Sequence, residues 1–545
     1  MDKLKMHSLD VVGSNIEKIQ LLFPNCVTER LGKDGKPELA IDFDKLKAEL
    51  SNEIIGEGEE RYQFTWPDKR VANRLANTPT TMTLRPCRGE SVDFDHTQNL
   101  YIEGDNLDVL KVLRETYLGK VKMIYIDPPY NTGNDFVYND DFAQSRNEFE
   151  ETSGLFDEEG NQTIDPMQRN TESNGRFHTD WLNMIYPRLK VARDLLTDDG
   201  VIFISIDDNE VENLKKICNE IFGAYNFQGH IHWRRRHNQP NDKTKMIGIV
   251  AEHILAYSKD CEYLRKVGVG KIELTANFTN PDNDPRGPWA SKPWKVGSDQ
   301  SGSRYTIVAP NGVVYNEEWM GEQETFEALL KDNRIIFTKN GEGLPRKKYF
   351  KYERQEEGQC ATNWWNHELF GHNQGANDCL TELFGIKNIF SNPKPIELMR
   401  GLLQIGNVKN DDIVLDFFSG SSSLAHAVIK MNNDDQVNIK FIMIQITEDL
   451  DESYKTADSK TKKKIEQAIR FLDSIGKSHT IPEIAKERIR RAGEKIKMEN
   501  ADMERAIDID TGFRVLKLDS SNMNDVYYSS FASSPMPSFS LRINL

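Results

Sequence analysis

Four short apolar runs in the chain have the pattern of strands buried inside a parallel sheet. They contain β-branched and aromatic residues and few polar ones: 121–126 (VKMIYI), 201–206 (VIFISI), 413–415 (IVL) and 440–446 (KFIMIQI). Between the first two runs, residues 179–196 place apolar side chains at helical spacing, and Pro187 should kink that helix. A further apolar helix is expected at 424–431. Alternating strands and helices predict an α/β fold with a mostly parallel sheet.

A polar segment separates the first strand from the first helix. Residues 145–175 are acidic and rich in Gly, Asn and Ser, a composition typical of loops. Because the segment follows a strand end, it could form a lid or a DNA clamp. An insertion without function is an equally good reading.

Composition limits the class of protein. The chain has 545 residues, enough for two or three domains, and contains no apolar run of membrane-spanning length. Its amino terminus, MDKLKMHSLD, lacks the apolar stretch of a signal peptide, so we expect a soluble, cytoplasmic protein without a membrane partner. The six cysteines form no C-x-x-C pair, which argues against disulfides and a zinc site. The eleven histidines show no metal-ligand spacing, so no metal is expected.

The net charge of −16 has the wrong sign for a protein that binds a polyanion. Acidic residues crowd 139–172, however, and basic residues gather elsewhere, some of them beside aromatic residues. The candidates for phosphate contact are Arg234, Arg235, Arg236, Lys243, Lys245, Arg346, Lys347 and Lys348. Each run could equally be an ordinary solvated surface.

The tetrapeptide Asp127-Pro128-Pro129-Tyr130 directly follows the first strand. Open α/β sheets place their ligand sites at the carboxyl ends of strands. The two prolines stiffen the turn, and one carboxylate, backbone carbonyls and an aromatic ring can grip a flat ring that carries an amino group. A flipped-out nucleobase is such a ring. A proline turn that merely ends the strand is the alternative.

A second turn, Asp416-Phe417-Phe418-Ser419-Gly420-Ser421, follows the third strand. Small residues at a strand-to-helix turn allow a ligand to approach the backbone closely. The last strand is followed by Glu448, and an acidic residue there suits ribose hydroxyls. The chain contains neither G-x-G-x-x-G nor a P-loop motif, so phosphate binding is not indicated. A nucleotide-type fold with another ligand, or a packed turn, remains possible on this evidence.

Seven segments carry a family resemblance: YIEGDNLDVLK from Tyr101, IYIDPPYNTGNDFVYNDDF from Ile124, TDWLNMIYPRLKVARDLLTDDGVIFISIDDNE from Thr179, WRRRHNQPNDKTKMIGIVAEHILAYSK from Trp233, NPKPIELM from Asn392, DFFSGSSSLAHAV from Asp416 and KERIRRAGEKI from Lys486. In this order they resemble the β group of adenine-N6 DNA methyltransferases, and more specifically the modification (Mod) subunits of Type III restriction–modification systems. The segments span most of 101–496.

The resemblance implies a fold, an activity and site residues. It implies a Rossmann-like methyltransferase domain, interrupted by a mixed α+β target-recognition domain, that transfers methyl groups from S-adenosylmethionine to N6 of a flipped-out adenine in double-stranded DNA. The catalytic residues would be Asp127, Pro128, Pro129 and Tyr130. The cofactor residues would be Asp105, Lys394, Pro395, Asp416, Phe418, Ser419, Gly420, Ser421 and Glu448.

The expected domains follow from pattern and resemblance together. They are an amino-terminal cap or oligomer element (1–93), the catalytic half of the methyltransferase domain (94–232), the target-recognition domain (233–387), the cofactor half (388–450) and a helical carboxyl-terminal region (451–545). The last of these ends in a serine-rich tail where the family continues with helices and strands, as a shortened or frame-altered end would. Formation of a homodimer and binding of a restriction (helicase–nuclease) subunit are therefore left open.

Three other functions fit parts of the pattern. Cytosine-N4 methyltransferases share the fold but usually carry Ser at the position of Asp127. Methyltransferases of RNA or of protein glutamine usually carry Asn there and the opposite motif order. A DNA-binding specificity subunit with impaired catalysis is the third alternative. The sequence does not identify the DNA site that is recognised.

Overall fold

The computed structural model describes residues 3–4, 8–31, 37–50, 62–133, 136–138, 167–169, 175–241, 243–273, 277–355, 358–457, 459–502, 509–520 and 526–527. The chain divides into two compact units, one formed by 1–269 with 362–545 and the other by 270–361. Most of the loop expected at 145–175, and the serine-rich tail, lie outside the described residues. No helix in the described part of the chain is long and apolar enough to cross a membrane.

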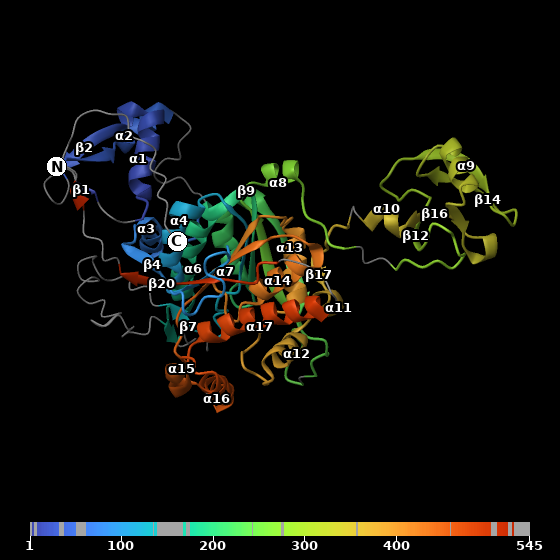
Figure 1. The fold of residues 1–545 in the computed structure, drawn as a ribbon. Coiled ribbons are helices and arrows are strands. Elements are labelled where there is room, and N and C mark those ends of the chain that lie inside the picture. Colours follow the sequence, from blue (N-terminus) through green and yellow to red (C-terminus); the bar gives the residue numbers. More distant parts are fainter. Residues whose placement is uncertain are drawn as a thin grey trace. The chain divides into compact units, whose positions relative to one another are not determined.

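A ten-stranded sheet forms the centre of the larger unit (Figure 1). Across the sheet its strands are β17 (Trp364–Trp365), β10 (Phe227–Arg234), β11 (Ala251–Ser258), β9 (Leu196–Ile206), β6 (Val121–Ile126), β18 (Ile413–Asp416), β19 (Lys440–Gln445), β5 (Leu100–Glu103), β20 (Arg514–Ser520) and β4 (Met82–Pro86). The strands from β9 to β20 run parallel to one another, and β11 and β4 are antiparallel to their neighbours. The α/β class with a mostly parallel sheet is confirmed.

The four apolar runs form the strands predicted from them. All six positions of β6 are buried, so side chains cover both faces of the sheet there. The run at 201–206 is the buried part of β9, and the runs at 413–415 and 440–446 match β18 and β19. Strands buried on both faces cannot alternate apolar and polar residues, which is why continuous runs identified them.

Helices cover the sheet and form most of the connections between its strands. The helices of this unit are α1 (Val11–Leu22), α2 (Phe43–Leu50), α3 (Lys69–Asn77), α4 (Asn106–Tyr117), α6 (Phe177–Leu195), α7 (Val211–Cys218), α8 (Cys261–Val267), α11 (His367–Phe370), α12 (Asn373–Phe384), α13 (Ile396–Ile405), α14 (Ser423–Asp435), α15 (Leu450–Thr456), α16 (Ser459–Ser474) and α17 (Ile481–Asp502). The helix α6 packs against α3 and α4, and α14 packs against α13 and α17. The predicted helix at 179–196 is confirmed and continues through Pro187.

The amino-terminal region contributes to this unit. The strand β4 pairs with β20, and the buried Trp66 donates a 2.7 Å hydrogen bond to the Asn183 amide oxygen in α6. The residues of the expected 1–93 element from Trp66 onward are therefore part of the main fold. Small strand pairs lie outside the large sheet: β1 (Lys3–Leu4) with β21 (Val526–Tyr527), β2 (Val27–Leu31) with β3 (Pro37–Ile41), and β7 (Phe136–Tyr138) with β8 (Met167–Arg169).

Buried ion pairs attach α17 to the sheet. The Lys486 ammonium is fully buried, lies 2.5 Å from Glu103 in β5 and 2.6 Å from Glu483, and also contacts Glu90. Lys517 in β20 pairs with Glu90 at 2.6 Å. A charge buried at this depth is tolerated only with such partners.

The smaller unit, 270–361, is a separate α+β structure. Its elements are β12 (Trp289–Pro293), β13 (Ser303–Val308), β14 (Val314–Trp319), α9 (Gln323–Lys331), β15 (Ile335–Phe337), β16 (Pro345–Phe350) and α10 (Lys351–Gln355). The strands β12, β16 and β15 form an antiparallel sheet, β13 and β14 form a hairpin, and Trp294, Trp319 and Phe326 lie in its core. The domain expected at 233–387 is longer than this unit, because β11 and β17 pair within the large sheet.

Candidate active site

Four neighbouring parallel strands end at one edge of the large sheet. In the order β6, β18, β19 and β5, they are followed by the segments 127–130, 417–422, 446–448 and 104–105. The D-P-P-Y turn and the small-residue turn thus lie on adjacent strands, although they are far apart in the sequence. The strand order therefore places the two turns next to each other at the same edge of the sheet.

The D-P-P-Y turn is fixed by hydrogen bonds to its side chains and its backbone. The Tyr130 hydroxyl donates to Asp127 Oδ1 at 2.7 Å. The indole N–H of Trp181 in α6 donates to the Pro129 carbonyl at 2.7 Å. The next residue, Asn131, has φ +59° and donates to Glu210 at 2.6 Å. Together with the two prolines, these bonds make the corner rigid.

Lys394 lies in the same corner. Its ammonium is 2.8 Å from both Asp127 carboxylate oxygens and 2.8 Å from the Tyr130 hydroxyl, and it lies 5.1 Å from the centre of the Tyr130 ring. The prediction had grouped Lys394 with the cofactor residues. The structure pairs its ammonium with Asp127, one of the expected catalytic residues, and Pro395 is the residue before the first turn of α13.

Glu252 is a second acidic residue in this corner, and the sequence analysis did not identify it. Its carboxylate lies 3.4 Å from the Lys394 ammonium and 3.3 Å from the Tyr130 hydroxyl, and it pairs with Arg235 at 2.8 Å. Burial disfavours the Lys394 ammonium, yet Asp127 and Glu252 raise the pKa of Lys394 above its ordinary value. Burial and the same two carboxylates raise the pKa of Tyr130, so its hydroxyl stays protonated.

The small-residue turn after β18 has a compact backbone. Gly420 has φ +49° and Ser422 has φ +57°, the left-handed region that favours glycine. A Cβ on Gly420 would lie 3.2 Å from the Phe390 ring, so a larger residue would displace its neighbour. The N–H of Ser419 donates to Ile444 at 3.1 Å, and that of Gly420 to the Gln445 side chain at 2.7 Å.

Side chains of the turn have different environments. Arg488 in α17 donates 2.8 Å hydrogen bonds to the hydroxyls of Ser421 and Ser423. Among the described residues, the buried hydroxyls of Ser419 and Ser422 have no hydrogen-bond partner. Phe418 packs into the main core.

Asp416 and Asp105 lie at the ends of β18 and β5. Burial raises the pKa of Asp416 well above its ordinary value, although the Phe418 N–H donates to its carboxylate at 3.0 Å. Asp105 caps α4 and pairs with the buried Arg188 at 2.9 Å. Arg188 donates to Asn106, whose amide donates to the Phe417 carbonyl at 2.7 Å. These bonds link the segment after β5 to the turn after β18, and neither residue was identified from the sequence.

A cavity of about 310 Å³ opens beside the small-residue turn. Its lining includes Gly420, Gln445, Glu448, Asn388 and Phe390, together with apolar side chains of α16 and α17. The Glu448 carboxylate accepts a 2.8 Å hydrogen bond from Ser453. Of the expected cofactor residues, Gly420 and Glu448 therefore lie on a cavity large enough for part of a nucleoside.

The expected DNA-binding residues have different environments. Lys243 and Lys245 are exposed, Arg234 is the last residue of β10, and Arg236 lies two residues after it. Arg346 donates to Ser291 at 2.9 Å, and Lys347 is half-buried on β16. Arg235 pairs with Glu252 in the active-site corner.

The prediction is wrong for Lys348. Its side chain is completely buried, and its ammonium is paired with Asp282 and Asp284 in the smaller unit. A lysine held in this way supports the fold and does not reach a phosphate.

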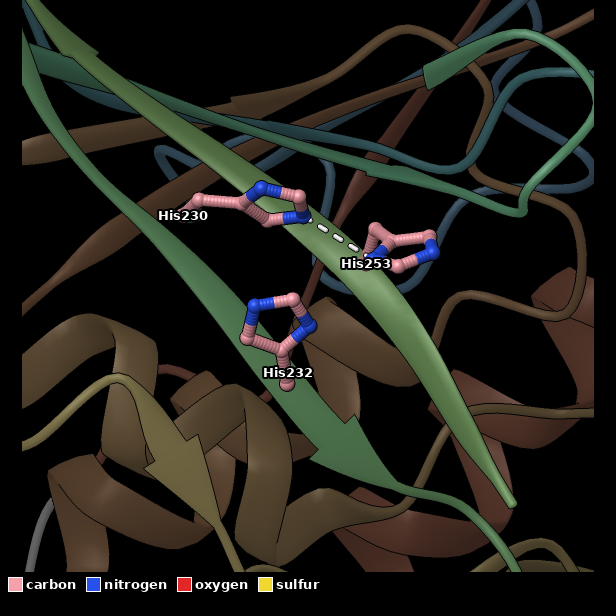
Figure 2. Close-up of side chains that lie close together, drawn as sticks. All are labelled: His230, His232 and His253. Carbon is pink, nitrogen blue, oxygen red and sulfur yellow. Dashed lines mark hydrogen bonds between the residues drawn. The ribbon is translucent and has the colours of Figure 1, made fainter. Parts of the chain in front are cut away.

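The spacing of the histidines in the sequence did not indicate a metal site, but the fold brings three of them together. His230, His232 and His253 gather on β10 and β11, with ring nitrogens within 4.8 Å of one another (Figure 2). The signal available in the sequence was the H-x-H pair at 230 and 232, since alternate residues of a strand share a face.

The chain is similar in sequence to known proteins. A family model described as DNA methylase matches residues 121–456. The chain is 34% identical over 510 residues to the Mod subunit of the Type III restriction–modification enzyme StyLTI of Salmonella typhimurium, covering 92% of this chain and 73% of that protein. It is 31% identical to the EcoP15I Mod subunit of Escherichia coli, covering 81% and 72%.

More distant similarities are also found. The chain is 27% identical to the Type II methyltransferase M.KpnI of Klebsiella pneumoniae, covering 65% of this chain and 81% of that protein. Among solved structures, the PvuII DNA methyltransferase (cytosine-N4-specific) matches 69% of this chain and 94% of its own, with 11% identity and a TM-score of 0.32.

Proposed function

Because the chain belongs to the DNA methylase family and is similar to Type III Mod subunits over most of its length, we propose that it methylates N6 of adenine in double-stranded DNA. It does so as the modification subunit of a Type III restriction–modification system, with S-adenosylmethionine as methyl donor. The single observation that carries this is the placement of the D-P-P-Y corner beside the small-residue turn at one sheet edge.

The residues around the small-residue turn fit S-adenosylmethionine. Gly420 and Glu448 line the cavity beside the turn, and Gly420 places no side chain in it. Glu448 can accept hydrogen bonds from ribose hydroxyls there. When bound, S-adenosylmethionine supplies an electrophilic methyl group on a sulfonium that needs no acid to leave.

Asp127 and the turn backbone activate the target amine. The N6 lone pair of adenine is delocalised into the ring, so the amine is a weak nucleophile. The Asp127 carboxylate and the Pro128 carbonyl accept hydrogen bonds from the two N6 protons, localise the lone pair on nitrogen and orient it. These bonds strengthen as positive charge develops on N6, which is the condition for catalysis by preorganised acceptors.

Lys394 and Tyr130 prepare the acceptor. The Lys394 ammonium donates hydrogen bonds to the Asp127 carboxylate, and the Tyr130 hydroxyl fixes its orientation. The Tyr130 ring is the stacking surface for the extruded base, a contact worth about 1–3 kcal/mol in proteins that bind single strands.

The unit at 270–361 is the centre of target recognition. It supplies β-strands and a basic strand face that includes Lys347, and side chains on strands can reach base edges in the major groove. The exposed Lys243 and Lys245, on the segment between β10 and β11, contact phosphates. As a Mod subunit, the chain binds a restriction subunit, and a homodimer would present two such recognition units.

The test is transfer of radiolabelled methyl groups from S-adenosylmethionine to unmethylated DNA. Asp127→Ala should lower the incorporation at least about a hundredfold, the cost of losing a transition-state hydrogen-bond partner. The matched control is Asp435→Ala, which removes a carboxylate paired with Arg400 away from the site. Digestion of the DNA should give labelled N6-methyladenine. Labelled N4-methylcytosine, or equal labelling by Asp127→Ala, would exclude the proposal.

A further inference from the structure

Three histidines project from the same face of two paired strands. His230 and His232 are two residues apart on β10, so their side chains lie on one side of the sheet. His253 on β11 is the direct cross-strand neighbour of His232. The rings of His230 and His232 are 4.4 Å apart between centroids, and those of His230 and His253 are 4.8 Å apart.

Hydrogen bonds determine which nitrogens face one another. His253 Nε2 lies 2.8 Å from Asp208 Oδ1, and a carboxylate can only accept, so Nε2 carries the proton of this ring. His253 Nδ1 is then the free lone pair, and it lies 2.9 Å from His230 Nε2 (Figure 2). Each of the three residues offers one nitrogen, and these nitrogens all lie within 4.8 Å of one another.

We propose that His230, His232 and His253 bind a zinc ion, and that Asp208 orients His253 from outside the coordination shell. Tetrahedral zinc with bonds of about 2.0–2.1 Å holds its ligand nitrogens about 3.3 Å apart. The gap between His230 and His253 must therefore open slightly as zinc replaces the shared proton, and His232 moves in by a rotamer adjustment. A water molecule completes the tetrahedron, since three side chains are present.

The surroundings favour this role. Zinc needs neutral imidazoles, and a carboxylate on the outer N–H of a ligand histidine is the usual orienting partner. Lys215 acts on His230 and opposes a cation, whereas Asp208 supplies the nearest negative charge.

The site would stabilise the strand that carries Glu252. A zinc ion there would link β10 to β11, and Asp208 would connect the segment after β9 to the same site through His253. Glu252 precedes His253, so its side chain projects from the opposite face, where it contacts Lys394 and Tyr130. The metal site is thus separate from the reaction centre and is independent of the methyl-transfer proposal.

The experiment measures zinc binding by the full-length, untagged chain after removal of metal with a chelator. Competition with a chromophoric chelator should give one zinc per chain. His232→Asn should weaken zinc binding at least about a hundredfold, and Asp208→Asn about ten- to a hundredfold, the usual cost of losing an outer partner. His96→Asn is the matched control, because His96 is also paired with an aspartate but lies outside the cluster.

Two further measurements keep the test decisive. Cobalt(II) added to the wild-type chain should give the visible spectrum of a tetrahedral site, whether or not a variant folds. Far-ultraviolet circular dichroism of each variant reports its fold. No stoichiometric zinc binding by the wild type, or zinc binding by a folded His232→Asn that equals the wild type, would overturn the proposal and leave a hydrogen-bonded histidine cluster.

Discussion

Replacement of Lys394 by methionine tests the electrostatics of the active-site corner. The substitution keeps most of the length of the side chain but removes an ammonium that contacts Asp127, Glu252 and the Tyr130 hydroxyl. Only 7% of the Lys394 side chain and 5% of that of Glu252 are exposed. The variant therefore leaves two carboxylates around one hydroxyl without the cation that balances them.

The expected loss follows from burial. Removal of one partner of a buried ion pair costs about 3–5 kcal/mol of unfolding free energy. Because Asp127 is 27% exposed, water compensates part of this cost, and we expect about 3 kcal/mol. Methyl transfer should fall about a hundredfold, since Asp127 becomes a poorer and less well-oriented acceptor.

A double-mutant cycle with Glu252→Gln isolates the cause. In the double variant only one carboxylate remains. Its loss of unfolding free energy should therefore be about 1–2 kcal/mol smaller than the sum of the losses of the two single variants, within the range for contacting residues. Urea unfolding of the four proteins gives this coupling energy, and radiolabelled transfer gives the activities. Additive losses would refute the account of a shared charge balance, as would a Lys394→Met variant with wild-type stability.

Three further predictions concern the fold and the DNA surface. Lys486→Met should lower the unfolding free energy by at least about 3 kcal/mol in urea titrations, because it leaves buried carboxylates unpaired; unchanged stability would contradict this. Burial alone would raise the pKa of Glu90, but Lys486 and Lys517 lower it to about 2. The stability that Glu90 contributes is therefore complete above its ordinary pKa of 4.5 and is lost as the pH falls toward 2. Urea unfolding across this pH range should show that decline in the wild type and a smaller decline in Lys486→Met. Lys245→Ala should reduce the slope of log affinity for DNA against log salt by about 0.9, and an unchanged slope would remove it from the phosphate-binding surface.

The sheet and the main turns could be predicted from the sequence because their signals are local. Residues 121–126 are apolar throughout, and a strand buried on both faces has this pattern. Parallel strands end at one edge, so Asp127 after one strand and Gly420 after another belong to the same edge. The strand order places them after adjacent strands.

The partners of Asp127 could not be predicted, because they come from distant segments. Glu252 lies on an antiparallel strand that the sequence analysis had assigned to another domain. Lys394 precedes α13, and only the folded chain shows its ammonium on Asp127. Nothing in the local pattern of either segment indicates these contacts.

Strand alternation explains the error at Lys348. A run of basic residues gives no indication of which members face solvent. In β16 successive side chains point to opposite faces, so Lys347 and Lys348 have different environments, and Lys348 is covered. The histidine cluster was missed for a related reason, since its third member comes from a neighbouring strand.

Equilibrium binding of labelled S-adenosylmethionine tests the central claim most directly, namely that one corner holds the base and the neighbouring turn holds the methyl donor. Asp127→Ala should bind the donor within about twofold of the wild type while failing to methylate DNA, because its bonds are made to the target base. Gly420→Val, whose side chain would strike Phe390, should weaken donor binding at least about tenfold, or ~1.4 kcal/mol. Loss of donor binding in a folded Asp127→Ala, with unchanged binding in Gly420→Val, would contradict the account.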